Sequence, residues 1–164
     1  MVEYIPAEIA HATSIAPRLR TADREEIQAA TGQPPVVALT KSIELSTLAR
    51  TVVIDGKPEG VFGVVELNPM TGAVWMVGTD ELVRLHARFY RAGKSWFTTL
   101  HERWPLLINY IDSRNKVHLR WLLRMGAEII TVEPEYGAEK RPFLLFRHVR
   151  TNNPVCPQHG GLCG

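Results

Sequence analysis

The chain has 164 residues, of which 45% are hydrophobic and 22% charged, and its net charge is +2. This composition is typical of one globular domain with its own core and excludes a disordered chain. The small net charge argues against a dedicated nucleic-acid binder, which usually has a concentrated basic face. No window approaches the roughly 18 apolar residues of a membrane span, and the first residues lack the pattern of a signal peptide. We therefore expect synthesis in the cytoplasm.

Short strands and helices alternate in the first half of the chain. An alternating run at 2–5 predicts a strand, and helices are expected over 7–16, 22–30 and 36–48. The second of these helices has acidic residues in its first turn, where the helix dipole favours them. Strands over 51–54 and 61–65 flank the turn Asp55-Gly56, which is typical of a hairpin, and a further strand is expected over 73–77.

The second half is organised around the stretch from Trp104 to Gly126. A nearly continuous apolar run at 106–111 predicts a buried strand, residues 112–115 offer helix caps, and Gly126 suits the end of an amphipathic helix. Before this stretch, a long helix is expected over 82–103, with a kink or boundary at Gly93 because glycine costs about 1 kcal/mol in a helix. Strands over 127–132 and 143–149 follow.

This order of elements predicts an α+β fold with a single domain over residues 1–150 and a Pro/Gly-rich C-terminal tail over 151–164. The helix at 82–103 must connect the strands at 73–77 and 106–111, and such a crossover implies that the two strands are parallel neighbours. We therefore expect a mostly antiparallel central sheet with one parallel junction, flanked by helices.

The same order resembles the GNAT (Gcn5-related N-acetyltransferase) fold, and residues 115–127 are similar to its last helix and following strand. A closer likeness lies in the blocks AVWMVGTDEL at 73–82, PLLINYI at 105–111, residues 114–127, and RPFLLF at 141–146. As a set they resemble a family of small bacteriophage proteins that includes the short internal virion protein of podophages. The likeness spans roughly residues 36 to 149 and implies a role in virion assembly and genome ejection.

One departure from the acetyltransferase pattern bears on activity. Working members of this fold have Gln/Arg-x-x-Gly-x-Gly/Ala after the central strand, and these glycines let backbone N–H groups close around the pyrophosphate of acetyl-CoA. Here residues 78–88 contain no glycine after Gly78, and Asp80 and Glu81 put two carboxylates where the phosphates would sit. The loop is therefore degenerate, and the expectation leans away from an enzyme.

A pocket is expected where the strands at 73–77 and 106–111 splay. Two asparagines at its rim have a structural alternative, in which Asn109 satisfies backbone at a strand edge and Asn115 caps a helix. The candidate cofactor-binding residues are Trp75, Met76, Val77, Asn109 and Asn115.

Catalytic side chains are harder to assign. A general base would have to come from Glu66, Asp80 or Glu81, but nothing in the sequence shows that one of them is buried. Tyr110 is a candidate proton donor to a departing thiolate, although a tyrosine in a core strand more often packs with its hydroxyl bonded. The catalytic residues therefore stay unassigned.

Basic side chains recur on two predicted helices. The first stripe has Arg84, Arg88 and Arg91, and the second cluster has Arg114, Lys116, Arg120 and Arg124. A solvated polar face is the simplest interpretation, because amphipathic helices need one. The alternative is a contact surface for DNA or an acidic protein partner.

The tail carries Cys156-x2-His159-x3-Cys163. A closed structural zinc site needs four ligands, and His148 is a candidate for the fourth. A Pro/Gly-rich terminus is more often a mobile or partner-docked extension. We expect no metal site, and a disulfide between the two cysteines stays equally open.

Two functions follow. The main hypothesis is a bacteriophage virion-associated or assembly and genome-ejection protein with a degenerate acetyltransferase-like fold. It would need no cofactor, would bind other phage structural proteins, and would be found in the host cytoplasm during assembly and in the virion. The alternative is an active acetyl-CoA-dependent N-acetyltransferase, which rests on fold order alone.

Overall fold

The computed structural model describes residues 1–151, with residues 86–88 described by their backbone alone. Its strands form a seven-stranded sheet in the order β1-β2-β3-β4-β5-β7-β6. The strands are β1 (Val2–Pro6), β2 (Leu48–Ile54), β3 (Lys57–Asn68), β4 (Thr71–Gly78), β5 (Leu106–Asp112), β6 (Glu128–Tyr136) and β7 (Arg141–Val149). β4 and β5 pair in parallel, and the other neighbouring strands pair antiparallel. The predicted α+β sheet with one parallel junction is therefore confirmed.

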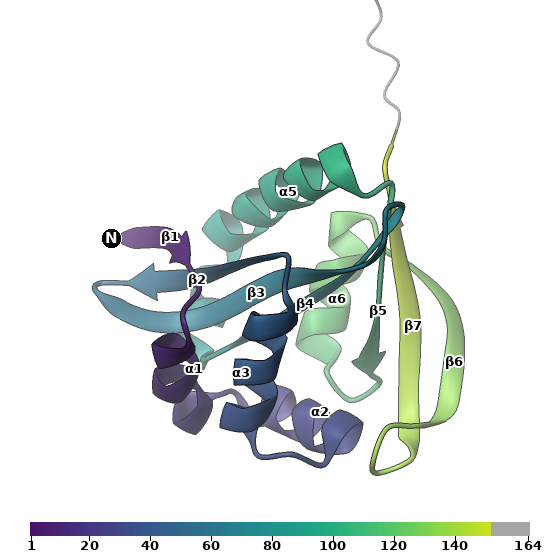
Figure 1. Cartoon of the computed structure of the whole chain (residues 1–164), viewed down its shortest axis with the longest axis horizontal. Coiled ribbons are helices and arrows are strands. Elements are labelled where there is room, and N and C mark those ends of the chain that lie inside the picture. Colours follow the sequence, from purple (N-terminus) through teal and green to yellow (C-terminus); the bar gives the residue numbers. More distant parts are fainter. Residues whose placement is uncertain (152–164) are drawn as a thin grey trace, which may run out of the picture.

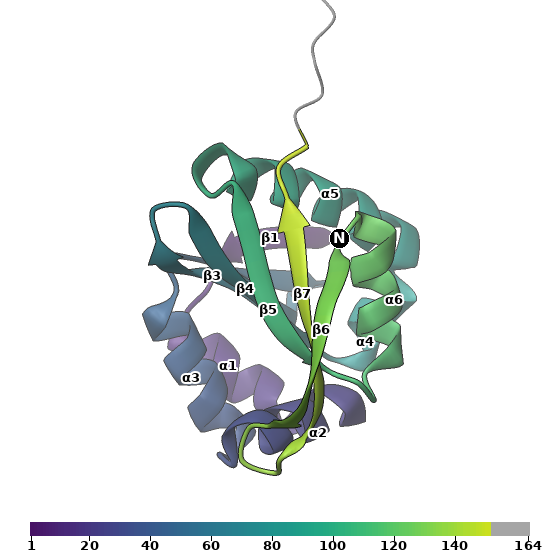
Figure 2. The ribbon, with the colours of Figure 1, turned by 90° about the vertical axis from the view of Figure 1, so that its right-hand side faces the viewer.

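Helices cover both faces of this sheet (Figures 1 and 2). One face carries α1, α2 and α3, and the other carries α5 and α6. The helices are α1 (Ile9–Ile15), α2 (Thr21–Thr31), α3 (Pro35–Leu45), α4 (Asp80–Arg84), α5 (His86–Arg103) and α6 (Lys116–Met125), with a 3-10 turn at Ala16–Arg18. No helix in the described part of the chain is both long and apolar enough to cross a membrane.

Each layer of helices buries its own core. Because side chains alternate along a strand, β4 contributes to both cores. Its Trp75 and Val77 pack toward Ile15 and Leu39 of α1 and α3, whereas Val74 packs toward Leu100 and other residues of α5 and α6. The strand is therefore covered on both sides.

The segment from Trp104 to Gly126 forms the predicted strand, turn and helix. Trp104 is fully buried, and its Nε1 donates to Glu66 Oε2 at 3.0 Å. Asn115 is the N-cap of α6 and accepts a hydrogen bond from the His118 N–H at 3.4 Å. Gly126 ends the helix with φ of +101°, a conformation that favours glycine.

Two helix boundaries differ from the sequence-based prediction. The third helix ends at Leu45 rather than 48, because the Thr47 N–H donates to the Val64 carbonyl and Leu48 begins β2. The long helix is divided at Leu85 rather than at Gly93. Gly93 instead lies inside α5 against Trp121, where a Cβ would come within 2.6 Å of the indole. Its lack of a side chain allows α5 and α6 to approach closely.

Candidate ligand-binding site between β4 and β5

The parallel junction between β4 and β5 is short. Pairing covers only the start of both strands, Thr71 to Ala73 against Leu106 to Ile108. β4 continues to Gly78 and β5 to Asp112, so the two strands diverge after three residue pairs. Within residues 1–151, β4 has no neighbouring strand on this side from Val74 onward.

Side chains and loops bond to the unpaired edge of β4 at its two ends. At one end, the Asn109 side-chain amide donates to the Val74 carbonyl at 2.7 Å. At the other end, the Gly78 N–H donates to Asp23 Oδ2 at 2.9 Å, and the Gly78 carbonyl accepts from the Arg20 N–H at 3.0 Å. The edge is therefore closed at both ends by protein groups.

Met76 lies between these two ends. In an antiparallel ladder, alternate residues direct their N–H and C=O groups toward the same neighbour. Val74 and Gly78 direct theirs away from β3, and Met76 is two residues from each. Its N–H and C=O therefore face the gap, where no β5 residue pairs with it.

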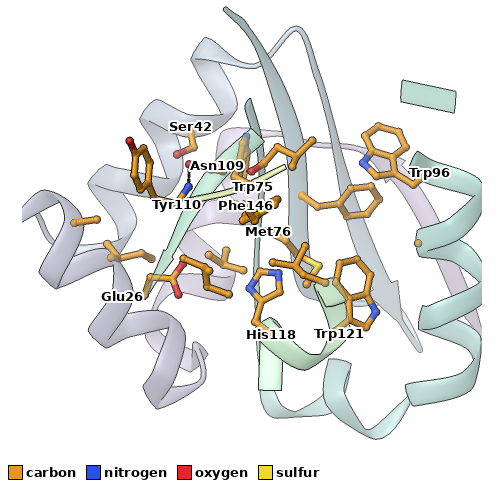
Figure 3. Close-up of a pocket in the computed structure, with 18 of the residues that line it drawn as sticks. Glu26, Ser42, Trp75, Met76, Trp96, Asn109, Tyr110, His118, Trp121 and Phe146 are labelled. Atoms are coloured by element: carbon orange, nitrogen blue, oxygen red, sulfur yellow. Dashed lines mark hydrogen bonds between the residues drawn. The ribbon is translucent and has the colours of Figure 1, made fainter. Parts of the chain in front are cut away.

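A cavity of about 460 Å³ occupies this gap. Figure 3 shows side chains from both helical layers projecting into it, so it passes through the sheet. Its lining is mainly apolar and aromatic, which is the composition of ligand pockets in general. The residues labelled in Figure 3 are Glu26, Ser42, Trp75, Met76, Trp96, Asn109, Tyr110, His118, Trp121 and Phe146.

Four of the five sequence-predicted binding residues line this cavity: Trp75, Met76, Val77 and Asn109. Asn115 does not. It is buried behind the cavity wall, where its side-chain amide donates to Glu26 Oε2 at 2.9 Å and to Asp23 Oδ1 at 3.2 Å. Asn115 therefore contacts the site through Glu26.

Glu26 is the acidic residue of the cavity, and sequence reasoning placed it only in the first turn of a helix. Its Oε2 accepts from Asn115 and from the Asp112 N–H at 3.3 Å. Burial raises the pKa of Glu26 to about 8, and the nearby Asp23 carboxylate acts in the same direction, while the bond from Asn115 opposes it. The carboxyl group thus gains and loses its proton near neutral pH.

His118 projects into the same cavity from α6 (Figure 3). Its Nδ1 is buried and has no hydrogen-bond partner in the part of the chain that the structure describes. Burial lowers the pKa of His118 to about 4, so the ring is neutral at physiological pH. A buried polar atom without a partner is costly.

The sequence-predicted candidates for a general base lie elsewhere. Glu66 binds Trp104 and pairs with Arg103 at 2.6 Å, and Asp80 and Glu81 are exposed at the start of α4. The cavity lining includes none of the three. Tyr110 does line the cavity, with its ring stacked on Tyr136 at 4.3 Å between centroids.

The turn after β4 is closed by protein groups. The Thr79 N–H donates to the Glu59 carbonyl at 2.8 Å and the Thr79 hydroxyl to the Glu59 carboxylate at 2.5 Å. Leu82 packs against Gly78, where a Cβ would come within 2.5 Å of its side chain. The N–H groups of Gly78 and Thr79 are therefore both occupied, and the acidic Asp80 follows them.

The basic residues singled out from the sequence are mostly exposed. Arg84 pairs with Glu81 at 2.5 Å, and Arg114 pairs with Asp112 at 2.6 Å.

His148, the candidate fourth metal ligand, hydrogen-bonds to His101 at 2.7 Å and to the Met125 carbonyl at 3.0 Å. The Arg88 side chain and the tail motif Cys156-x2-His159-x3-Cys163 lie outside the described residues. Within those residues, no three metal-ligating side chains cluster.

No protein-family model matches the sequence, and no curated protein matches it. Solved structures do resemble the fold. A protein described as a putative acetyltransferase has a TM-score of 0.69 at 17% identity, with 90% of this chain and 85% of that one covered. Ard1 from Thermoplasma volcanium has a TM-score of 0.69 at 9% identity, covering 90% and 97%.

The ribosomal-protein-S18-alanine N-acetyltransferase of Escherichia coli has a TM-score of 0.65 at 13% identity, covering 93% of this chain and 98% of that one. These likenesses support the fold to which the sequence has a resemblance and give no support to the bacteriophage part of that resemblance. At such low identity they show the fold alone. The chain therefore has the GNAT fold.

Proposed function

We propose that this chain is an acyltransferase that moves an acetyl group from acetyl-CoA to an amine. The observation that carries the proposal is the gap in the sheet, where the Met76 backbone faces a cavity that passes between β4 and β5. The chain of coenzyme A that bears the thioester is extended and contains amide groups. Such a chain can pair with Met76 as a strand would, because backbone N–H and C=O groups seek partners.

The cavity also suits the reacting thioester. Its walls are mainly aromatic and apolar, with a few polar groups from Glu26, Asn109 and His118. Exclusion of water from such a site strengthens the remaining electrostatic interactions and prevents hydrolysis of the thioester. The GNAT fold of the neighbouring structures, which include N-acetyltransferases, supports the same reaction class by analogy.

The phosphates of coenzyme A would not bind to this chain as they bind to relatives that carry the pattern Gln/Arg-x-x-Gly-x-Gly/Ala. The first two N–H groups of the turn after β4 already donate to Asp23 and Glu59. Asp80 and Glu81 add negative charge at the same place. In the proposed complex, the acyl-bearing chain of coenzyme A therefore makes the contacts with the protein, and the phosphates remain in solvent.

A second candidate is a non-catalytic adaptor, such as the phage assembly protein that the sequence resembles. The observation that favours it is the closed, acidic turn after β4, because a protein without a nucleotide ligand needs no open phosphate site. In this case the cavity would bind no coenzyme A, and the exposed basic residues of α5 and α6 would be available to a protein or DNA partner.

Isothermal titration with acetyl-CoA separates the two candidates. We expect wild-type protein to bind with micromolar affinity. Ser42→Phe should weaken binding at least about tenfold, because Ser42 lines the cavity and a phenyl ring would fill part of it. Lys41→Phe adds the same ring on the exposed side of α3 and should leave the affinity within about twofold. If the wild-type protein gives no heat at millimolar acetyl-CoA, the acyltransferase proposal is wrong and the adaptor is favoured.

A further inference from the structure

Three elements meet at the polar end of the cavity. α2 contributes Glu26, the end of β5 contributes the Asp112 N–H, and the start of α6 contributes Asn115 and His118. Asn115 is 1% exposed and bridges Glu26 and Asp23 with its amide while its carbonyl oxygen caps α6. The Glu26 carboxyl is therefore held by bonds from two other elements.

The hydrogen bonds leave Oε1 of this carboxyl group without a partner among the described residues. Both bonds that Glu26 accepts fall on Oε2, from the Asn115 amide and the Asp112 N–H. Glu26 also lines the cavity, as Figure 3 shows. A fixed carboxyl group with a free oxygen at a cavity is the geometry needed for proton transfer to or from a bound molecule.

His118 borders the same end of the cavity. Its Nδ1 is buried without a partner in the described residues, although the ring projects into the cavity. Buried polar atoms in folded proteins are nearly always hydrogen-bonded, so an unpartnered one calls for an explanation. The ring of His118, rather than this shielded atom, borders the space beside Glu26 in which a ligand would lie.

We propose that Glu26 is the general base for a primary amine acceptor, which would lie in the cavity between the Glu26 carboxyl group and the His118 ring. This inference rests on the proposed acyltransferase function. The amine nitrogen attacks the thioester carbonyl carbon, the new C–N bond forms, and the C–S bond breaks to release the thiolate. The proton lost by the nitrogen moves to the Glu26 carboxylate and then to solvent.

The surroundings of Glu26 agree with this role. Asp23 on the same helix pairs with Arg20 at 2.5 Å, and Asp112 on β5 pairs with Arg114 at 2.6 Å, so both neighbouring carboxylates have a cation. Tyr136 on β6 is close enough to interact with the Glu26 charge, and Tyr110 on β5 stacks on Tyr136. A group that is protonated and deprotonated near neutral pH is the most effective general base at that pH.

The test is kinetics with acetyl-CoA and phenethylamine, followed by release of free thiol, in wild type, Glu26→Gln and Glu25→Gln. Glu25 is the matched control because it is the adjacent residue of α2 and is half exposed. We expect Glu26→Gln to lower kcat about 10² to 10⁴-fold, to keep the dissociation constant for acetyl-CoA, and to lose the rise of kcat/KM with pH toward about 8. Glu25→Gln should behave as wild type.

The possible failures are distinguishable. If wild-type protein neither binds acetyl-CoA nor releases thiol, the proposed function and the proposed role of Glu26 are both wrong. If wild type and Glu26→Gln release thiol at equal rates with the same pH profile, the acyltransferase function stands and Glu26 is not its base. Thermal melting of each variant shows whether a loss of rate reflects unfolding, and a folded Glu26→Gln that also loses acetyl-CoA binding would contradict the assignment.

Discussion

Replacing Trp104 with alanine is expected to lower the free energy of unfolding by about 3–5 kcal/mol, the usual cost of removing a buried tryptophan. Trp104 is 0% exposed and lies in the core beneath α5. Its Nε1 donates to Glu66, and the Arg103 guanidinium lies over its ring at 4.7 Å. The alanine variant would lose the packing and leave the Glu66 carboxylate with Arg103 alone. Urea denaturation followed by circular dichroism measures the change.

Trp104→Phe is the matched control for this variant. Phenylalanine keeps most of the buried volume but cannot donate to Glu66, so we expect a loss of only about 1–2 kcal/mol. If alanine at this position costs less than about 1 kcal/mol, Trp104 does not anchor the junction between α5 and β5.

The stability of the protein is expected to fall as pH rises from 6.5 to 8. The pKa of Glu26 is about 8 in the folded chain and 4.5 as its ordinary value. Between these values the folded state holds a proton that the unfolded state has released, so stability falls by about 1.4 kcal/mol per pH unit. Because Glu26 is half ionised at pH 8, the slope flattens toward that pH, and the loss between pH 6.5 and 8 should be about 1–2 kcal/mol.

His118 makes the stability of the protein rise with pH, and it does so at lower pH than the range in which Glu26 makes stability fall. Its pKa is about 4 in the folded chain against 6.5 ordinarily, so its contribution to stability is lost as pH falls through this range. Between pH 4.5 and 6.5 the contributions of Glu26 and His118 nearly cancel. Above pH 6.5 the contribution of His118 changes by less than about 0.5 kcal/mol, so Glu26 dominates the window from pH 6.5 to 8.

Glu26→Gln tests this dependence directly. Glutamine keeps an oxygen that can accept from Asn115 but carries no titrating group, so stability should be nearly constant from pH 6.5 to 8. Glu25→Gln should retain the wild-type loss. Urea denaturation at a series of pH values measures the three curves, and a wild-type curve without a decline in this window would show that Glu26 is ionised in the folded state.

The fold followed from the sequence because its signals were local. The apolar run at 106–111, the cap at Asn115 and the glycine at 126 each predict a strand, a helix start or a helix end by their own chemistry. The crossover helix then predicts the parallel junction. The predictions were wrong where tertiary contacts determine the structure. At Gly93 a kink or boundary was expected, but the missing side chain makes room for Trp121 of α6.

The polar part of the site could not be predicted in the same way. Glu26 is separated from Asn115 by 89 positions and from Asp112 by 86, and no spacing in the sequence relates them. Its place in the first turn of a helix indicated an exposed acid that favours the helix dipole. Trp75 to Val77 and Asn109 were predictable as cavity residues only because their strands were expected to splay.

The most direct test of the central claim is a titration of ¹⁵N-labelled protein with acetyl-CoA, followed by the amide resonance of Met76. Binding of the acyl-bearing chain in the gap between β4 and β5 predicts that this amide shifts with saturation and that its exchange with solvent slows. Unchanged amide resonances along 74–78 and 106–112 at millimolar acetyl-CoA would contradict the claim that this opening in the sheet receives the coenzyme.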